Sequence, residues 1–235
     1  MKKIFLILAL ISTVNIFSKN FTVMTYNIYG GRNSKASVLA EHIKEYNPDF
    51  ICLQEVDKNT LRSGNTDYTK DIADILGYKY YYFRKARDFN FGEFGISIIS
   101  KHPLEIIYVH TLASTDEEKR QVVMTKLKDE DILIVNTHLS FEEKENKEQI
   151  NELIRVIDSV KSKNKIICGD FNVLPKTQGY ENLVKNFVDT YSDLEKPRID
   201  YIFTNNKKFM IKKSSFLYKE KDLSDHLPYQ VEFEF

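Results

Sequence analysis

The stretch Lys165-Ile166-Ile167-Cys168-Gly169-Asp170-Phe171-Asn172-Val173 carries a short apolar segment straight into a polar corner. The apolar segment predicts a buried strand that ends in a turn. Asp170 and Asn172 then lie two residues apart, where a carboxylate can manage a water or proton and a carboxamide can donate hydrogen bonds to one phosphate. Taken alone, the stretch is better explained as a simple turn, so a functional interpretation depends on whether other strands end in the same way.

The rest of the chain alternates apolar, strand-like segments with a few helical patterns. Apolar residues at helical spacing predict the longest helix over residues 142–161, and Ser34 is predicted to cap an earlier helix that stops at Asn47-Pro48. Residues 121–127 and 132–139 predict a hairpin. Because strands outnumber helices, we expect an α/β sandwich with packed sheets and outer helices. The remaining predicted strands are residues 21–29, 49–56, 78–83, 95–100, 106–110, 165–167, 199–204, 209–216 and 229–235.

Length and composition limit the class of protein. At 235 residues with 42% hydrophobic content, the chain can bury one sizeable core, so we expect one domain over residues 21–235. Lysine plus arginine and aspartate plus glutamate both number 34, so no basic surplus indicates tight, non-specific nucleic-acid binding. A nuclease with a local phosphate-binding patch stays compatible with this balance. We expect a monomer.

The first eighteen residues have the pattern of a secretory signal peptide. Lys2 and Lys3 precede an apolar run that is shorter than the ~20 residues of a membrane span. Residues 1–18 are therefore predicted to be cleaved, with an uncleaved anchor as the alternative. We expect export to the periplasm or the exterior, without stable membrane insertion after cleavage. Export permits a disulfide, yet Cys52 and Cys168 each lie within an apolar strand, which favours buried free thiols.

Polar residues follow several predicted strands at one end. Each alone has a structural explanation, such as a turn, a cap or a core histidine. Their recurrence at the same end of apolar strands predicts one shared site. The residues are Asn27, Glu55, His138, Asp170, Asn172, Asp200, Asp225 and His226.

The chemistry of this set indicates a metal and a proton-transfer pair. Glu55 with Asp225 or Asn27 offers a few hard oxygen ligands, which suits Mg²⁺ that keeps waters and meets a phosphate. Zn²⁺ is disfavoured because acids predominate and no His-x-x-x-His spacing occurs. An aspartate paired with a histidine holds the imidazole in one tautomer for proton transfer.

Six local motifs surround these residues: Asn27 after a strand, Leu53-Gln54-Glu55-Val56-Asp57, Asn136-Thr137-His138-Leu139, Gly169-Asp170-Phe171-Asn172, Arg198-Ile199-Asp200-Tyr201-Ile202 and Ser224-Asp225-His226-Leu227-Pro228. In this order they resemble the endonuclease/exonuclease/phosphatase superfamily, from Phe21 to the end of the chain. The resemblance implies a DNase I-like four-layer α/β sandwich, in which two packed mixed β-sheets are flanked by helices.

The resemblance also implies a role for each position of the site. Glu55 is implied as the principal metal ligand, with Asn27 and Asp225 close to an Mg²⁺ ion, for which Mn²⁺ can substitute. Asp170 is implied to position or deprotonate the attacking water. The other implied roles are a phosphate-oxygen donor at Asn172, an acid at Asp200 that orients His226, phosphate contact or proton transfer at His226, a second phosphate-facing histidine at His138, and an acid paired with that histidine at Glu93.

The chain departs from two branches of this superfamily. Nucleases of the pancreatic DNase type carry an arginine two residues beyond the metal glutamate, and here that residue is Asp57. Repair nucleases that act at abasic sites have tryptophans around the lesion pocket, and this chain has none. Residues 60–100 look more like exported bacterial hydrolases with diverse substrates. The cations of this region are candidates for binding a second phosphate or an anionic leaving group, unless they are solvated loop charges: Arg62, Arg84, Lys85 and Arg87.

The resulting hypothesis is a secreted Mg²⁺-dependent phosphoesterase that cleaves a P–O bond by in-line attack of activated water. Its substrate is expected to be a phosphate ester. A non-specific nuclease and a phosphodiesterase or phosphatase for small or lipid-linked phosphates are nearly level. The alternative from another class is a protein that binds phosphate-bearing ligands without turnover. The complete set of eight polar residues argues against that alternative.

Overall fold

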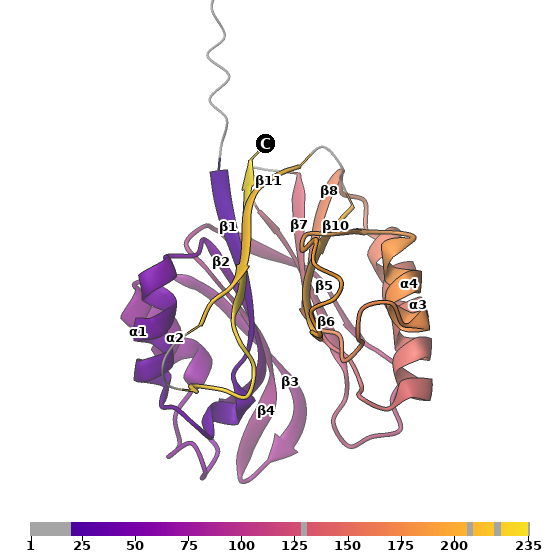
Figure 1. Cartoon of the computed structure of the whole chain (residues 1–235). Coiled ribbons are helices and arrows are strands. Elements are labelled where there is room, and N and C mark those ends of the chain that lie inside the picture. Colours follow the sequence, from indigo (N-terminus) through magenta and orange to yellow (C-terminus); the bar gives the residue numbers. More distant parts are fainter. Residues whose placement is uncertain (1–19, 128–130, 206–208, 219–221, 235) are drawn as a thin grey trace, which may run out of the picture.

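Apolar segments of the chain form two six-stranded mixed sheets in the described residues, which are 20–127, 131–205, 209–218 and 222–234 of this computed structural model (Figure 1). The first sheet contains, in spatial order, β11 (Met210–Phe216), β12 (Tyr229–Glu234), β1 (Asn20–Asn27), β2 (Phe50–Lys58), β4 (Gly92–Ser100) and β3 (Tyr80–Phe89). The second contains β5 (Leu104–Thr111), β6 (Gln121–Leu127), β7 (Ile132–His138), β8 (Asn164–Asp170), β10 (Asp200–Thr204) and β9 (Val188–Asp189).

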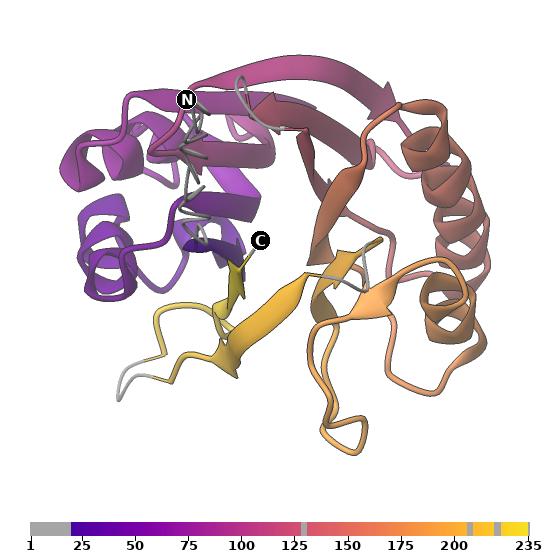
Figure 2. The same cartoon turned by 90° about the horizontal axis from the view of Figure 1, so that it is seen from above.

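Helices cover the outer face of each sheet, and the inner faces pack together (Figures 1 and 2). Helices α1 (Ala36–Tyr46) and α2 (Tyr68–Leu76) share a buried cluster with the first sheet. Helices α3 (Glu143–Ser159) and α4 (Gln178–Val184) share one with the second sheet. The four-layer α/β sandwich predicted from the sequence is therefore confirmed.

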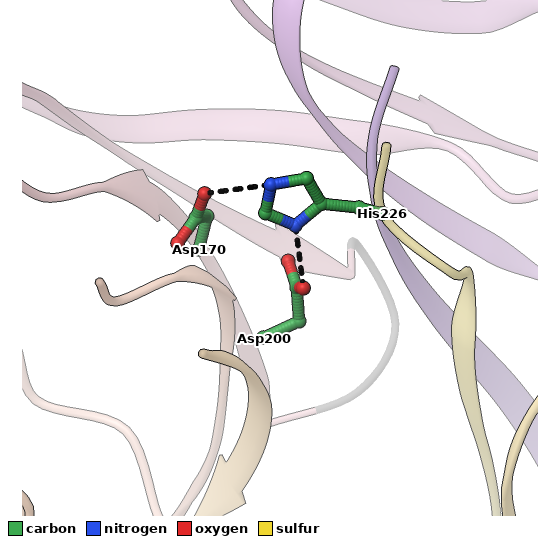
Figure 3. A group of neighbouring side chains, drawn as sticks. All are labelled: Asp170, Asp200 and His226. Carbon is green, nitrogen blue, oxygen red and sulfur yellow. Dashed lines mark hydrogen bonds and ion pairs between the residues drawn. The ribbon is translucent and has the colours of Figure 1, made fainter. Parts of the chain in front are cut away.

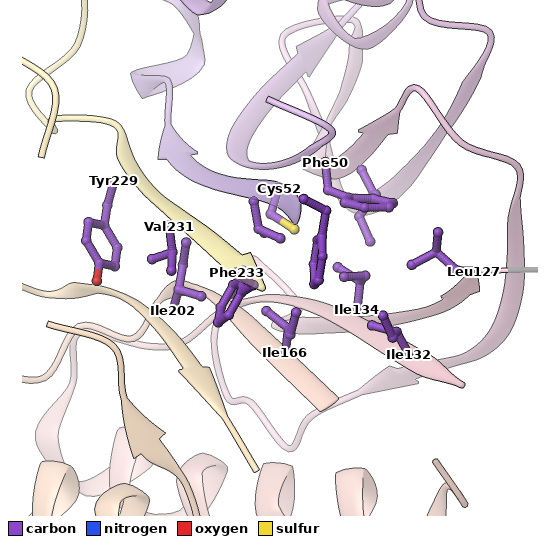
Figure 4. Packing of buried hydrophobic residues seen from close by; sticks show 14 of the residues in the cluster. Phe50, Cys52, Leu127, Ile132, Ile134, Ile166, Ile202, Tyr229, Val231 and Phe233 are labelled. Atoms are coloured by element: carbon purple, nitrogen blue, oxygen red, sulfur yellow. The ribbon is translucent and has the colours of Figure 1, made fainter. Parts of the chain in front are cut away.

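The core between the sheets is built from strand residues that point inward. Cys52 and Val231 of the first sheet join Ile134 and Ile166 of the second in one buried cluster (Figure 4). Burial of each large aliphatic side chain stabilises the fold by ~1.5–3 kcal/mol. A charge introduced at Ile134 would therefore separate the two sheets.

Two parallel strand pairs decide where the polar strand ends meet. β1 lies parallel to β2, with Asn27 opposite Gln54, and β7 lies parallel to β8, with His138 opposite Asp170. Since parallel strands end at the same edge, each sheet gathers its carboxyl ends on one side. β10 runs antiparallel to β8, so its first residue, Asp200, also lies opposite Asp170.

Local predictions from the sequence are partly correct. The hairpin is confirmed, because β6 and β7 pair antiparallel, and α3 occupies most of the predicted longest helix. The predicted cap at Ser34 is wrong. The cap position of α1 is Lys35, which makes no side-chain cap, and the Ser34 carbonyl instead accepts a hydrogen bond from Tyr68 Oη over 3.2 Å.

Both cysteines are free thiols in the core between the sheets, as the sequence predicts. Burial raises the pKa of Cys168, and its hydrogen bond with Cys52 raises it further, so this thiol is unreactive near neutral pH. The predicted signal peptide, residues 1–18, lies outside the described residues. Within the described ranges, no helix combines the length and apolarity that crossing a membrane requires.

Candidate active site

The carboxyl end of β1 links the two sheets through one amide. Asn27 is fully buried, and its Nδ2 donates to Glu55 Oε1 over 3.1 Å and to Asp170 Oδ2 over 3.0 Å. Its Oδ1 accepts the backbone N–H of Tyr29 over 3.0 Å, which fixes the amide's orientation. Asn27 therefore holds a carboxylate of the first sheet beside a carboxylate of the second.

Two site residues have left-handed backbone conformations. Glu55 has φ +52° at a point where the register between β2 and β4 shifts, and Asn172 has φ +49° just after β8. A bulge re-aims the side chain out of regular alternation, and a left-handed non-glycine residue costs ~1–3 kcal/mol. The register shift and the left-handed conformation direct the Glu55 carboxylate toward Asn27, out of the alternation of a regular strand.

His226 and Asp200 form a hydrogen-bonded pair (Figure 3). His226 Nδ1 lies 2.7 Å from Asp200 Oδ2, and its Nε2 lies 3.8 Å from Asp170 Oδ2. Ser224 supports this geometry, because its Oγ donates to the Asn27 carbonyl over 2.7 Å and accepts the His226 backbone N–H over 3.2 Å. The loop before β12 is thereby fastened to the end of β1, with the imidazole directed at Asp170.

Opposite charges around His226 stabilise its protonated form. Burial of the ring lowers the pKa of His226. The hydrogen bond and the charge of Asp200 outweigh this effect and, with smaller contributions from the charges of Asp170 and Asp225, raise the pKa to about 9. The ring is therefore protonated at neutral pH, with Nδ1–H donating to Asp200 and Nε2–H directed toward Asp170.

Asp170 is a buried carboxylate with neighbours of both signs. Burial and the charge of Asp200 raise its pKa to about 7, while His226 and hydrogen bonds from Asn27 and the backbone N–H of Asn172 oppose the rise. The Asn172 N–H donates to Asp170 Oδ1 over 3.0 Å. A carboxylate poised near neutral pH, with a fixed orientation, has the properties of a general base.

His138 lies on the other side of Asp170. Its Nε2 is 3.6 Å from Asp170 Oδ2 and 3.4 Å from Asn172 Nδ2. Burial, with the charges of Arg120 and His226, holds the pKa of His138 well below its usual range. The two histidines of the site therefore differ in charge at neutral pH, His138 neutral and His226 positive.

The acid beside His138 is Glu118, and the sequence-based pairing of His138 with Glu93 is wrong. Glu118 Oε1 lies 3.4 Å from His138 Nδ1 and accepts Arg120 Nη1 over 2.7 Å. The Glu93 carboxylate instead lies 3.3 Å from Lys58 Nζ and 3.7 Å from Lys85 Nζ. The run 116–120 has the composition of a solvated loop, but it leads into β6, and the side chain of Arg120 is only 3% exposed. The sequence signal for this contact was the pair Glu118 and Arg120, two opposite charges directly before the apolar strand β6.

Asp57, at the position where DNase-type nucleases carry an outward-reaching arginine, binds Arg62 within the protein. Its fully buried carboxylate accepts Arg62 Nε over 2.6 Å and Arg62 Nη2 over 2.7 Å, a bidentate pair. Gly30 makes room for it, because a Cβ at that residue would lie 2.2 Å from Arg62 Nη2. With Asp57 in place of the arginine of DNase-type nucleases, the guanidinium near Glu55 is that of Arg62, and it is held in place by Asp57.

A buried polar network joins the two sheets beneath the site. Asn136 Nδ2 donates to the carbonyls of Leu53 and Ser97 over 3.0 and 2.8 Å, and its Oδ1 accepts Gln54 Nε2 over 2.7 Å. Gln54 and Asn136 belong to motifs quoted from the sequence, yet no role was predicted for them. They fix the distance between strands that carry Glu55 and His138.

Asp225 lies at the rim of the site. It is exposed, and together with Asp200 and His226 it lines a cavity of about 230 Å³ that also includes Tyr218. The structure thus brings seven predicted residues into one contact network, with Asp225 adjoining it and Glu93 outside it. The seven are Asn27, Glu55, His138, Asp170, Asn172, Asp200 and His226.

The donor atoms fit a hard divalent cation. Glu55 is half-buried, and among the described residues none donates a hydrogen bond to its Oε2. Asp225 adds an exposed carboxylate, so few protein oxygens would be complemented by water and phosphate, as Mg²⁺ prefers. A second set, Asp170, Asp200 and His226, has ligand atoms within 4.8 Å of one another, but the Asp200–His226 hydrogen bond occupies two of them. Glu55, by contrast, keeps one carboxylate oxygen that no described residue engages.

Comparison with known proteins identifies relatives over nearly the whole chain. The Endonuclease/Exonuclease/phosphatase family model matches residues 24–226. The CCR4-Not complex 3'-5'-exoribonuclease subunit Ccr4 of Candida albicans is 23% identical over 229 residues, covering 70% of this chain and 28% of that protein. The chain therefore spans less than a third of that relative.

Solved structures share the fold. An endonuclease/exonuclease/phosphatase from Beutenbergia cavernae matches with a TM-score of 0.72 and 19% identity, over 91% of this chain and 71% of that one. A mannosyl-6-phosphatase from Bacteroides thetaiotaomicron matches with a TM-score of 0.69 and 20% identity, over 92% of this chain and 100% of that one. Members of the matched family are hydrolases that act on phosphoester bonds, and they typically depend on a divalent metal. Since the family model spans most of the residues and the fold agrees, this chain belongs to the endonuclease/exonuclease/phosphatase family.

Proposed function

We propose that the chain is an Mg²⁺-dependent phosphoesterase that hydrolyses phosphodiester bonds by attack of water. The position of Asp170 carries the proposal. Its Oδ2 accepts Asn27 Nδ2, which also binds Glu55, and lies 3.6 and 3.8 Å from the Nε2 atoms of His138 and His226. One carboxylate of pKa about 7 therefore faces the metal ligand on one side and two histidines of different charge on the other.

The proton transfers follow from these pKa values. Asp170 takes a proton from water as the water oxygen attacks phosphorus. The P–O bond to the leaving alcohol breaks, and His226 gives its Nε2 proton to the leaving oxygen. Asp200 keeps the imidazole oriented through Nδ1–H and stabilises its charge. The product phosphate and the alcohol then leave the site.

Asn172 and His138 are proposed to hold the non-bridging phosphate oxygens. Asn172 Nδ2 donates to the Leu139 carbonyl over 2.9 Å, and its other contact is with His138. Neutral His138 presents Nε2 beside it, at 3.4 Å. A neutral amide and a neutral imidazole at this position would contact phosphate oxygens without competing with Asp170 for a proton.

Glu55 and Asp225 would hold Mg²⁺, or Mn²⁺ in its place, with Asn27 beside the ion. When bound, the ion supplies Lewis-acid stabilisation of the charge that develops on the phosphate oxygens. Asn27 contributes mainly by fixing the Glu55 carboxylate, because its Oδ1 already accepts the Tyr29 N–H.

Phosphatase activity on small or lipid-linked phosphates is the second candidate. The buried Asp57–Arg62 pair favours it, since the arginine with which DNase-type nucleases reach DNA is replaced here by an internal anchor. The mannosyl-6-phosphatase of the same fold supports it by analogy. A protein that binds phosphate groups without turnover is the third candidate, and it predicts metal-dependent binding without product.

Export is part of the proposal. The signal-peptide pattern of residues 1–18 supports secretion to the periplasm or the exterior, and we propose that the mature chain acts there as a monomer. Mass spectrometry of the N-terminus from fractionated cells, with size-exclusion chromatography of the mature chain, tests both statements. An intact N-terminus in the cytoplasmic fraction would contradict export.

Release of p-nitrophenol from bis-(p-nitrophenyl) phosphate and from the monoester tests the activity. We expect hydrolysis of the diester that EDTA abolishes and that excess Mg²⁺ restores. Faster hydrolysis of the monoester would favour the phosphatase candidate. Absence of metal-dependent hydrolysis across DNA, RNA, lipid and sugar phosphates would refute the proposed function.

A further inference from the structure

Two arginines and two phenylalanines form a cluster beside Glu55, which we call the arginine cluster: Arg62, Arg87, Phe89 and Phe94. Phe94 of β4 pairs with Asp57 of β2 on one side and with Arg87 of β3 on the other. Asp57, the partner of Arg62, is two residues beyond Glu55, so the cluster on β3, β4 and the turn after β2 lies at the metal-ligand end of the sheet.

Both guanidinium groups lie over the same two rings. Arg62 Cζ is 4.4 Å from the Phe89 ring centre and 5.6 Å from that of Phe94. Arg87 Cζ is 4.6 and 5.2 Å from the same two centres. Aromatic rings at these distances attract the cation and restrict the plane of the guanidinium. The cluster therefore presents two preoriented cations.

The two arginines differ in how their charge is compensated. Arg62 is neutralised by its bidentate pair with Asp57. The side chain of Arg87 makes no hydrogen bond or ion pair with any residue in the described ranges, and its Nε is buried without a partner. A preoriented guanidinium of this kind has unused donors for an anion.

Nearby cations on β3 are already engaged. Arg84 Nε donates to Gln121 Oε1 over 3.0 Å. Lys85 Nζ lies 3.2 Å from Asp88 and 3.7 Å from Glu93. Among the four cations that the sequence singles out in this region, Arg87 is thus the one whose side chain has no hydrogen-bond or ion-pair partner in the described residues.

Arg87 is connected to the catalytic side of the site. The backbone N–H of Lys119 donates to the Ala86 carbonyl over 3.2 Å, which places Glu118 next to the start of the Arg87 side chain. Glu118 in turn lies 3.4 Å from His138 Nδ1. The charge of Arg87 also opposes the burial that raises the pKa of Glu118, so the two groups are within electrostatic range.

We propose that Arg87 binds a second phosphate of the substrate, covalently linked to the group that carries the scissile phosphate. The inference rests on the proposed phosphoesterase function and narrows its substrate class to molecules with two phosphates, such as oligonucleotides or bisphosphorylated small molecules. A guanidinium can bind such a phosphate through two parallel hydrogen bonds. If Arg87 only balanced the acids Glu55 and Glu118, its removal would weaken all phosphate ligands equally.

Competitive inhibition distinguishes these roles. The inhibition constants of thymidine 5'-monophosphate and thymidine 3',5'-bisphosphate are measured from initial rates with bis-(p-nitrophenyl) phosphate in excess Mg²⁺. The readout is the ratio of the two constants, in which any general loss of activity cancels. We expect the wild-type protein to bind the bisphosphate about tenfold or more tightly, as one charged hydrogen-bonded contact provides.

Arg87→Ala should reduce this preference to about twofold or less. Arg87→Lys retains a cation without the planar fork and should give an intermediate ratio, which also guards against misfolding of the alanine variant. Lys85→Ala is the matched control, because it removes one positive charge from the same strand, and it should leave the ratio at the wild-type value.

Three results would overturn the inference: equal constants in the wild type, a preference that survives Arg87→Ala, or an equal loss of preference in Lys85→Ala. Failure of the proposed function gives a different result, the absence of metal-dependent hydrolysis by the wild type. In that case isothermal titration calorimetry of the same two nucleotides in Mg²⁺ decides the role of Arg87 separately, by the same ratio in wild-type and variant proteins.

Discussion

Substitution of Asp200 by asparagine should make the activity defect depend on pH. Asp200 accepts a 2.7 Å hydrogen bond from His226 Nδ1 and contributes most to the rise of the His226 pKa from 6.5 to about 9, against burial of the ring and with help from Asp170 and Asp225. This change corresponds to about 3 kcal/mol in favour of the protonated ring, at 1.36 kcal/mol per pH unit. Asparagine at this position keeps the size of the side chain but removes the charge.

The size of the defect follows from the protonated fraction of His226. At pH 8 about nine-tenths of a group with pKa 9 is protonated, against about 3% of a group with pKa 6.5. Activity that needs the His226 proton should therefore fall about 30-fold at pH 8 from protonation alone, and far less at pH 6. The ring with the raised pKa stays protonated until the pH exceeds that pKa, so the alkaline limb of the rate profile should move down by about 2.5 pH units in the variant.

The Asp200 charge also contributes to the raised pKa of Asp170, so the acid limb should move in the same direction. The assay is kcat/KM for bis-(p-nitrophenyl) phosphate from pH 5.5 to 10 in saturating Mg²⁺, with NMR titration of the His226 ring. Asp193→Asn, which removes an exposed carboxylate, serves as the control. A defect of the same size at pH 6 and pH 8, with unchanged limbs, would refute the account of this pair.

Three further predictions concern the metal, the proton-transfer pair and the sheet contact. Glu55→Gln should raise the Mg²⁺ concentration for half-maximal rate about tenfold or more while the melting temperature stays near wild type; an unchanged titration would remove Glu55 from the metal site. His226→Ala should cost ~10²–10⁴ in rate, and adding Asp200→Asn should cost little more; a double-variant loss equal to the product of the single losses would mean that the residues act independently. Asn136→Ala removes hydrogen bonds to two strand carbonyls and to Gln54, so urea unfolding should show at least about 3 kcal/mol of destabilisation; a loss under about 1 kcal/mol would mean that the network is dispensable.

The strand ends could be predicted from the sequence because each one follows a short run of consecutive apolar residues. Apolar segments before Asp170 and His138 read as buried strands, and parallel pairing then brings their ends together. The resemblance supplied the partner of His226, which a pattern alone leaves open between Asp170, Asp200 and Asp225. Sequence therefore predicts that His138 and Asp170, each at the end of a buried strand, lie side by side.

Contacts made by loops and bulges were harder to predict. Glu93 lies on a regular strand but pairs with lysines of its neighbours, while Glu118 reaches His138 because the segment before β6 hydrogen-bonds to the Ala86 carbonyl. The orientation of Glu55 depends on a register shift that has no sequence signature of its own. These features arise from tertiary contacts between segments far apart in the chain, which no local pattern records.

Hydrolysis by the Asp170→Asn variant tests the central claim most directly, that this carboxylate activates water for attack on a phosphate ester. Asparagine keeps the shape but is no base, and it loses one of the two oxygens that accept Asn27 Nδ2 and the Asn172 N–H. With bis-(p-nitrophenyl) phosphate in saturating Mg²⁺ at pH 8, the wild-type protein should show EDTA-sensitive turnover and the variant a rate ~10²–10⁴ lower. The variant should still bind thymidine 5'-monophosphate in a calorimetric titration. A folded variant that retains more than about a tenth of the wild-type rate would contradict the claim.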